Sequence, residues 1–199
     1  MKKREITSQQ LIEAATMLFA HHGIEKTSLA MIAAEVGMTK PSIYYHFASK
    51  EELVEKVFDA MFEDYHFETY FSVSDFNERN FAQQLYQGGL RMFPEDDGNM
   101  HAAMRLLNEF MLTAGRGTDY GKRVVRMQQA FLDGFRRLLQ HGAELGVIAK
   151  ENVESKAYLL ALAIDNMTAY KMMGIRLDYE TIWKEAVNSM FRKGGNVIA

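Results

Sequence analysis

The chain of 199 residues contains no cysteine, which excludes disulfide bonds and thiolate metal sites. This absence fits a reducing cytoplasm, where we expect the protein to be located. Only two prolines, Pro41 and Pro94, interrupt the sequence, so long stretches are free to form helices. There is no apolar run of about 18 residues, and Met1-Lys-Lys-Arg leads directly into polar sequence. We therefore expect neither a membrane span nor a signal peptide.

Motifs for catalysis and metal binding are also missing. The sequence has no Gly-rich phosphate loop, no HExxH, no EF-hand pattern and no Ser or Cys nucleophile motif. The six histidines are scattered along the chain in no spacing typical of a metal site. We therefore predict no catalytic residue, no cofactor and no metal. An enzyme that works in a methionine-rich cavity stays open as an alternative, although no chemistry for it is evident.

The composition, 48% hydrophobic and 25% charged, is typical of a soluble globular protein. The net charge of −3 at first argues against nucleic acid as a partner. However, residues 1–50 carry six Lys or Arg against four Glu, which leaves −5 for the remainder. A basic end joined to an acidic body suits a protein that binds DNA at one end only. Residues 1–6 read either as a short basic arm along the phosphate backbone or as a frayed terminus.

The most informative stretch is 27–50, with the sequence TSLAMIAAEVGMTKPSIYYHFASK. Ser28 is a candidate N-cap of a first helix, and Gly37, which can adopt a positive φ, ends that helix. Thr39 and Pro41 suit the start of a second helix, in which Ile43 points back at the first. This pattern predicts a helix-turn-helix.

The outer side of the second helix is rich in groups that contact phosphates and base edges. A cation, hydroxyls, aromatic rings and an imidazole come from Lys40, Ser42, Tyr44, Tyr45 and His46. Ser49, with Glu52 three residues later, predicts a capping box at the start of a further helix. Lys50 lies beside the free N–H groups of that helix end, where a phosphate is favourable. An ordinary packed helical hairpin is the alternative interpretation.

At these residues the chain closely resembles the TetR (tetracycline-repressor) family of bacterial transcription regulators. The pattern Thr-Ser…Ile-Ala…Val-Gly-Met-Thr-Lys-Pro-Ser-Ile-Tyr-Tyr-His-Phe…Ser-Lys-Glu-Glu-Leu follows that family's DNA-binding signature and covers about the first quarter of the chain. Pro41 departs from the family, which often has glycine there, and should not prevent docking on DNA. The resemblance implies a DNA-binding set of Thr27, Ser28, Thr39, Lys40, Pro41, Ser42, Tyr44, Tyr45, His46 and Lys50. Within it, we expect Thr27, Tyr45, His46 and Lys50 to hold phosphates, and Lys40, Ser42 and Tyr44 to lie nearest the base edges.

Helical periodicity continues along the rest of the chain and predicts an all-α protein of about nine helices. The first helix is expected from about Thr7 to Gly23. A fourth, from Lys50 to about Tyr70, would join a DNA-binding domain of residues 1–50 to a second domain of residues 51–199. Five further helices are expected at about 78–93, 99–114, 119–145, 153–174 and 178–193. No alternating stretch is long enough for a sheet.

The resemblance implies that the second domain forms a homodimer through its last two helices. The interface would fall on about 153–193, with Ala157, Ala161, Leu162, Asp165, Ala169, Val187 and Phe191 as candidates. The small alanines allow close helix crossing, although packing inside a monomer explains them as well. A dimer is also favoured because two-fold pairing doubles the contact that one helix-turn-helix makes with DNA.

The resemblance further implies a small-molecule effector in the second domain. Fourteen methionines are many for this length, and with the aromatic residues they suit a pocket for a loosely specified hydrophobic ligand. The candidate ligand-binding set is Phe62, Tyr65, His66, Met104, Asn108, Met111, Met127, Phe131, Asn166 and Tyr170. Each of these residues is also explained by ordinary core packing or by exposure to solvent.

Together these features lead us to expect a dimeric, ligand-responsive transcription regulator. It would be a repressor that leaves a palindromic double-stranded operator when a small hydrophobic effector binds. The effector would bias the fourth helix and change the separation of the two recognition helices. The alternative is a helical ligand-binding or interaction protein whose helix-turn-helix is degenerate and does not act on DNA.

Overall fold

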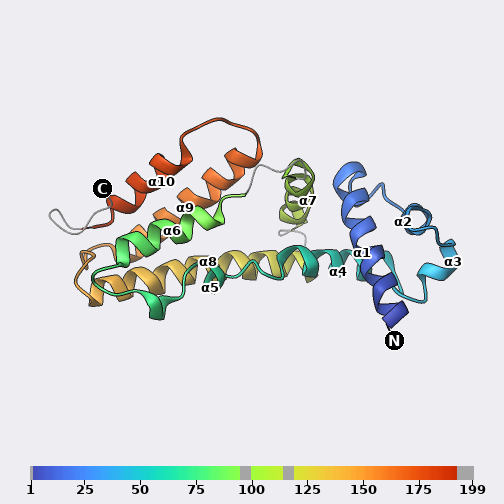
Figure 1. Ribbon diagram of the computed structural model, residues 1–199, viewed down its shortest axis with the longest axis horizontal. Helices are drawn as coiled ribbons and strands as arrows, with labels where there is room; N and C mark the ends of the chain where they lie inside the picture. The colour runs from blue at the N-terminus through green and yellow to red at the C-terminus, as the bar shows by residue number, and fades with distance from the viewer. Residues whose placement is uncertain (1, 95–99, 114–118, 192–199) are drawn as a thin grey trace. The chain divides into compact units, whose positions relative to one another are not determined.

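The computed structural model describes residues 2–94, 100–113 and 119–191 (Figure 1). Within these residues the structure is helical and has no β-strand, which confirms the predicted all-α fold. The helices are α1 (Lys2–His22), α2 (Leu29–Glu35), α3 (Lys40–Ile43), α4 (Lys50–Phe62), α5 (Phe67–Tyr70), the 3-10 helix η1 (Val73–Asp75), α6 (Phe81–Met92), α7 (Met100–Thr113), α8 (Asp119–Glu144), α9 (Val153–Met172) and α10 (Tyr179–Asn188).

The predicted fourth helix of residues 50–70 is wrong in its length. Helix α4 ends at Phe62, and His66 is extended, with φ −121° and ψ 148°, before the short helix α5 begins. The break lets Phe67 turn inward, where it is buried with its ring 5.2 Å from that of Phe135. Periodicity alone missed this, because an aromatic stripe reads the same in one long helix as in two short ones. Helix α1 also begins earlier than expected, at Lys2, so residues 2–6 extend the helix.

The contacts between residues divide the chain into two compact units. Among the described residues, unit 1 comprises 2–65, 100–113 and 119–125, and unit 2 comprises 66–94 and 126–191. Helix α8 therefore contributes its first residues to unit 1 and the rest to unit 2. This division differs from the predicted boundary at residue 50, because α4, α7 and the start of α8 pack with the helix-turn-helix. Where a DNA-binding domain ends in the functional sense stays a prediction.

Unit 1 is built on an apolar core to which α1, α2, α4 and α7 all contribute. Phe19, Ile32, Leu53 and Phe110 are buried almost completely. Burying a side chain of this size contributes roughly 1.5–3 kcal/mol relative to leaving it exposed. The start of α8 joins the unit through Arg123, which forms an ion pair with Asp59 of α4 and lies over the ring of Phe58. The helix-turn-helix thus shares one apolar core with α1, α4 and α7.

Unit 2 packs α6, α9 and α10 side by side (Figure 1). The single tryptophan, Trp183 of α10, is fully buried, and its indole N–H donates to the carbonyl of Tyr86 at 3.0 Å. Gly89 makes this approach of α10 to α6 possible, because a Cβ atom there would lie 2.2 Å from the indole ring. The Tyr86 hydroxyl donates to Glu180 at 2.7 Å, and burial first, then this bond, raises the pKa of Tyr86 to about 12. Tyr86 of α6 therefore bonds to α10 through both its carbonyl and its hydroxyl.

Candidate functional sites

The helix-turn-helix of unit 1 is set by capping and by one turn. The Ser28 hydroxyl accepts the N–H of Met31 at 3.2 Å and starts α2 as predicted. Gly37 has a φ of +70°, as predicted, and ends α2 by turning the chain toward α3. Ile43 of α3 is fully buried in the apolar core of unit 1. Since the inner side of α3 is fixed by burial, its outer side is held in a defined orientation.

That outer side carries the groups expected to meet DNA. Lys40 is exposed, and so are the rings of Tyr44 and Tyr45, at 51% and 77% of their surface. Exposed aromatic rings of this extent, beside a cation, mark an interaction surface. The Thr39 and Ser42 hydroxyls lie 2.8 Å apart and bond to each other. Pro41 is exposed at the start of α3, where its missing N–H costs nothing.

Two further predicted contact residues are positioned by neighbouring elements. The Nδ1 atom of His46 lies 3.0 Å from the Ser8 hydroxyl of α1. The Lys50 ammonium donates to the carbonyl oxygen of Glu25 at 3.2 Å. The predicted N-cap of α4 is confirmed, because Glu52 N–H donates to the Ser49 hydroxyl at 3.2 Å, whereas the Glu52 carboxylate accepts the N–H of Ala48, one residue before the N-cap, at 2.6 Å. These bonds hold the imidazole and the ammonium at the edge of the same surface.

The structure places Thr27, for which the sequence predicts a phosphate contact, inside the protein. Its side chain is 1% exposed, and its hydroxyl lies 2.9 Å from the Gly23 carbonyl and 3.2 Å from the Leu18 carbonyl. The hydroxyl is thus used inside the protein to join the end of α1 to the start of α2. From the sequence alone, the hydroxyl of a threonine just before a helix N-cap could donate to a DNA phosphate or to a carbonyl inside the protein. The burial of Thr27 decides between these two possibilities.

The turn between α1 and α2 is also bonded to a side chain of α7. The Glu109 carboxylate accepts the backbone N–H of Ile24 at 2.7 Å. The turn, Glu109, Leu112 and Tyr120 line a small pocket of about 340 Å³ in unit 1. This bond was not predicted, because its partners are 85 residues apart in the sequence. It ties α7 directly to the segment that leads into the helix-turn-helix.

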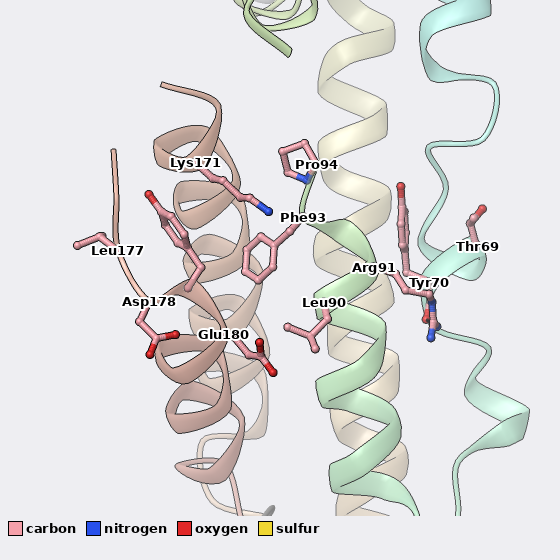
Figure 2. Close-up of a pocket in the computed structure, with 11 residues that line it drawn as sticks. Thr69, Tyr70, Leu90, Arg91, Phe93, Pro94, Lys171, Leu177, Asp178 and Glu180 are labelled. Atoms are coloured by element: carbon pink, nitrogen blue, oxygen red, sulfur yellow. Dashed lines mark hydrogen bonds between the residues drawn. The ribbon is translucent and has the colours of Figure 1, made fainter. Parts of the chain in front are cut away.

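Unit 2 contains a larger pocket of about 870 Å³ (Figure 2). It is lined by the end of α5, the last residues of α6, the end of α9 and the segment that starts α10. Its lining residues are Thr69, Tyr70, Leu90, Arg91, Phe93, Pro94, Lys171, Leu177, Asp178, Tyr179 and Glu180. The size suits a drug-like molecule, and the mixture of rings and charges suits an amphipathic one.

None of the ten residues predicted to bind ligand is among those that line this pocket. Phe62, Tyr65, Asn108 and Met111 belong to unit 1, as does α7 with Met104, whose side chain lies outside the description. In unit 2, His66, Asn166 and Tyr170 are exposed, Met127 is half-buried, and Phe131 is buried in an aromatic cluster with Phe67 and Tyr70. The prediction weighted apolar and aromatic residue types, whereas the pocket uses Arg91 and Lys171 at helix ends.

The predicted dimer residues fall into two groups. Ala157, Ala161 and Val187 are 0%, 4% and 0% exposed within the single chain, so they pack inside unit 2 and cannot form a surface. Leu162 is 58% exposed, whereas Ala169 is half-buried. Asp165 is also half-buried, and burial raises the pKa of its carboxyl to about 6. The ring of Phe191 is half-buried and lies 6.2 Å from that of Phe81. The small side chains of Ala157 and Ala161 are thus buried, but within one chain and not between two chains.

An exposed apolar stripe, formed by Leu159, Leu162, Tyr170 and Met173, runs along α9 instead. These residues are 58%, 58%, 44% and 55% exposed, and their spacing of three, eight and three places them on one side of the helix. Ile182 of α10 is a further exposed apolar residue of unit 2. An exposed apolar surface of this kind marks a site of association.

Two other kinds of site are absent from the described residues. No described helix is long and apolar enough to cross a membrane. In the same part of the chain, no three His, Asp or Glu side chains are grouped so that they could hold a metal ion.

A cation and two aromatic rings exposed on the second helix of a helix-turn-helix and on the turn after it are typical of DNA-binding domains. Residues 11–57 match the family model described as bacterial regulatory proteins, tetR family. The chain is 44% identical over 57 residues to the HTH-type transcriptional regulator TtgR of Pseudomonas putida, which covers 29% of this chain and 27% of TtgR. It is 43% identical over 51 residues to a probable acrEF/envCD operon repressor of Escherichia coli, covering 26% and 23%. The matched segment thus spans about a quarter of the length of these relatives.

The fold is similar to solved structures over nearly the whole chain. A complex of SmeT with triclosan matches with a TM-score of 0.70 and 17% identity, over 96% of this chain and 95% of that one. A TetR transcription regulator from Haloarcula marismortui matches with a TM-score of 0.69 and 14% identity, over 96% and 100%. At these identities the likeness concerns the fold. The amino-terminal segment of the chain thus matches the TetR family, and the fold of nearly the whole chain is similar to that of a TetR regulator.

Proposed function

We propose that the chain is a sequence-specific transcription repressor that a small effector releases from its operator. The observation that carries this proposal is the outer surface of α3 and of the turn after it, where Lys40, Tyr44 and Tyr45 are exposed while Ile43 is buried beneath them. These groups suit the major groove, which a helix can enter with cations and hydroxyls toward the bases. No catalytic step is assigned to any residue.

Contacts with DNA are assigned by position. Lys40, Ser42 and Tyr44 face the base edges, and Tyr45, His46 and Lys50 face the phosphates. Ser28, Thr39 and Pro41 shape the two helix starts, where backbone N–H groups and hydroxyls can meet the phosphate backbone. Thr27 acts from inside, by holding the α1–α2 turn.

The operator is palindromic in this proposal, because the protein binds as a homodimer. Two recognition helices would enter successive major grooves about 34–36 Å apart. The exposed stripe of α9, with Leu159, Leu162, Tyr170 and Met173, supplies the apolar surface that a dimer would bury.

The effector would occupy the pocket of unit 2. Helix α8 contributes residues to both units, so it is the described element through which a ligand in unit 2 can act on unit 1. The sequence predicts this role for a fourth helix of residues 50–70, but α4 ends at Phe62. Effector binding would lower DNA affinity by favouring a state with a different separation of the recognition helices.

The first test is a footprint of the purified protein on the DNA that flanks its own gene, at a stated salt concentration. We expect a protected, roughly palindromic site. A matched pair of variants separates readout from anchoring: Lys40→Ala should change the preferred bases, whereas Lys50→Ala should weaken all sequences alike. A folded dimer that protects no DNA even at low salt would contradict the repressor proposal and favour an interaction protein with a degenerate helix-turn-helix.

Dimerisation is tested by sedimentation of Leu162→Glu against Gln140→Glu. Gln140 is exposed on α8, outside the stripe. We expect the first variant to sediment as a monomer or to dissociate at higher concentration, and the second to behave as wild type. If the two variants sediment alike, the α9 stripe is not part of the dimer interface.

A further inference from the structure

The charged groups of the unit 2 pocket differ in how far their bonding capacity is used. The Glu180 carboxylate accepts the Tyr86 hydroxyl at 2.7 Å, and the Asp178 carboxylate caps α10 by accepting the N–H of Thr181 at 3.0 Å. Both carboxylates are also exposed, so water can satisfy their remaining lone pairs. Neither group needs a ligand to complete its bonding.

The two cations of the pocket are satisfied to different degrees. The Arg91 guanidinium donates to the backbone carbonyl of Tyr70 at 2.5 Å, which fixes its orientation and leaves further N–H donors. The Lys171 ammonium has no carboxylate within ion-pair distance among the described residues. Among the described residues, the ammonium lies over the ring of Phe93, whose centre is 5.7 Å from the nitrogen. Lys171 therefore has three N–H donors and no hydrogen-bond acceptor in this part of the chain.

Lys171 has one structural role that needs no ligand. It lies in the last turn of α9, where a cation interacts favourably with the helix dipole. That role does not explain its half-buried position over an aromatic ring, since an exposed side chain at the same helix end would serve equally well. Figure 2 shows the ammonium extending from α9 toward Phe93, with Leu90 below that ring in this view.

Apolar surface adjoins this cation. The rings of Phe93 and Tyr179 lie 6.0 Å apart, and the Tyr179 hydroxyl is used in a bond to the Ile175 carbonyl at 2.6 Å. Leu90 and Pro94 continue the apolar lining. A flat apolar body can therefore lie on these side chains while a negative group on it reaches the ammonium.

We propose that the effector pocket selects an aromatic anion, such as a carboxylate or phenolate, through an ion pair with Lys171. The apolar body of the ligand lies against Phe93, Leu90 and Tyr179. The ligand is called an effector because this inference rests on the proposed function of a ligand-responsive repressor. Its binding, however, is measured without DNA.

The test uses three probes with one aromatic body and different charges. They are 1-naphthoate, 1-naphthalenemethanol and 1-naphthylmethylammonium, titrated into the full chain by isothermal calorimetry at low and moderate salt. We expect 1-naphthoate to bind about tenfold more tightly than the neutral alcohol, as one charge-assisted hydrogen bond in a half-buried site allows. The preference should weaken as salt rises, because the charges are partly screened.

Variants assign the preference to one side chain. Lys171→Met keeps the length and removes the charge, so it should bind the anion and the alcohol equally, while Lys171→Arg should restore most of the preference. Lys156→Met, on the same helix but outside the pocket lining, is the matched control and should bind as wild type.

Equal binding of the anion and the alcohol by wild type would overturn the proposal. So would a preference for the ammonium probe, which would point to Asp178, Glu180 and the acidic residues that follow Pro94 in the sequence. A retained anion preference in Lys171→Met would move recognition to another cation. DNA binding is measured separately by footprinting. A protein that prefers the anion but binds no operator would contradict the proposed repressor function and leave the proposed anion selectivity intact.

Discussion

The carboxyl group of Asp165 gives a quantitative prediction about stability. It lies at the edge of the inner side of α9, half-buried, and burial raises its pKa from 3.8 to about 6. A shift of about two units corresponds to about 3 kcal/mol at most, or about 1.5 kcal/mol after allowance for solvent at a side chain that is not fully buried. The ionised carboxylate therefore destabilises the folded chain near pH 7.

The sign follows from the direction of the shift. A folded-state pKa above the unfolded value means that the folded chain binds the proton more tightly. The contribution of Asp165 is thus fully present below about pH 4 and is lost as the pH rises through about 6. Asp165→Asn, which stays neutral, should unfold at the same urea concentration as wild type near pH 4. At pH 8 it should be more stable by about 1.5–3 kcal/mol.

The assay is urea unfolding of both proteins from pH 4 to 8 at one fixed protein concentration, because dimerisation would also shift the midpoint. Asp64→Asn, at an exposed position of unit 1, is the control and should shift stability by less than about 0.5 kcal/mol at every pH. A difference between Asp165→Asn and wild type that is the same at pH 4 and pH 8 would refute the argument from burial. A less stable Asn variant at pH 8 would mean that the carboxylate has a partner in the assembled dimer.

Three further predictions concern the helix-turn-helix and the core of unit 2. Glu109→Ala removes the acceptor of the Ile24 N–H and should lower the free energy of unfolding by about 1–3 kcal/mol, a fall in Tm of about 2–12 °C. Glu109→Gln keeps an acceptor and should lower it less. Equal losses of stability in the two variants would contradict a role for this hydrogen bond. Gly89→Ala places a Cβ atom against Trp183 and should lower stability by about 1–3 kcal/mol and alter the tryptophan emission, while Gln87→Ala, exposed on the same helix, should change neither. Lys50→Ala should reduce the slope of log affinity against log salt by about 1; an unchanged slope would rule out its phosphate contact.

Local sequence rules predicted the helix-turn-helix well. Ser28, Gly37 and Ser49 act through their own or nearby backbone groups, and each does in the structure what the sequence indicated. Capping and turn residues need only the few residues around them, so their signals survive without tertiary information. The outer face of α3 was predicted for the same reason, because a few consecutive turn and helix positions determine what points outward.

Long-range contacts were beyond the reach of such rules. The pocket of unit 2 joins segments far apart in the sequence, from Thr69 to Glu180, and its Lys171 sits at the end of a helix that reads as ordinary in the sequence. Methionine content indicated an apolar interior but not its location, since any Met or Phe at helical spacing also fits plain core.

The sequence by itself determined the fold class, the capped starts of α2 and α4 and the groups exposed around α3, because these depend on hydrophobic periodicity and on capping within a few residues. Only the tertiary structure decided that α4 ends at Phe62, that Thr27 faces inward and that Ala157, Ala161 and Val187 are buried within the chain. It also placed Lys171 over Phe93 beside the pocket. The physical reason is that burial and hydrogen-bond partners are properties of pairs of distant residues. A helix carries the same periodicity whichever neighbour covers its apolar face.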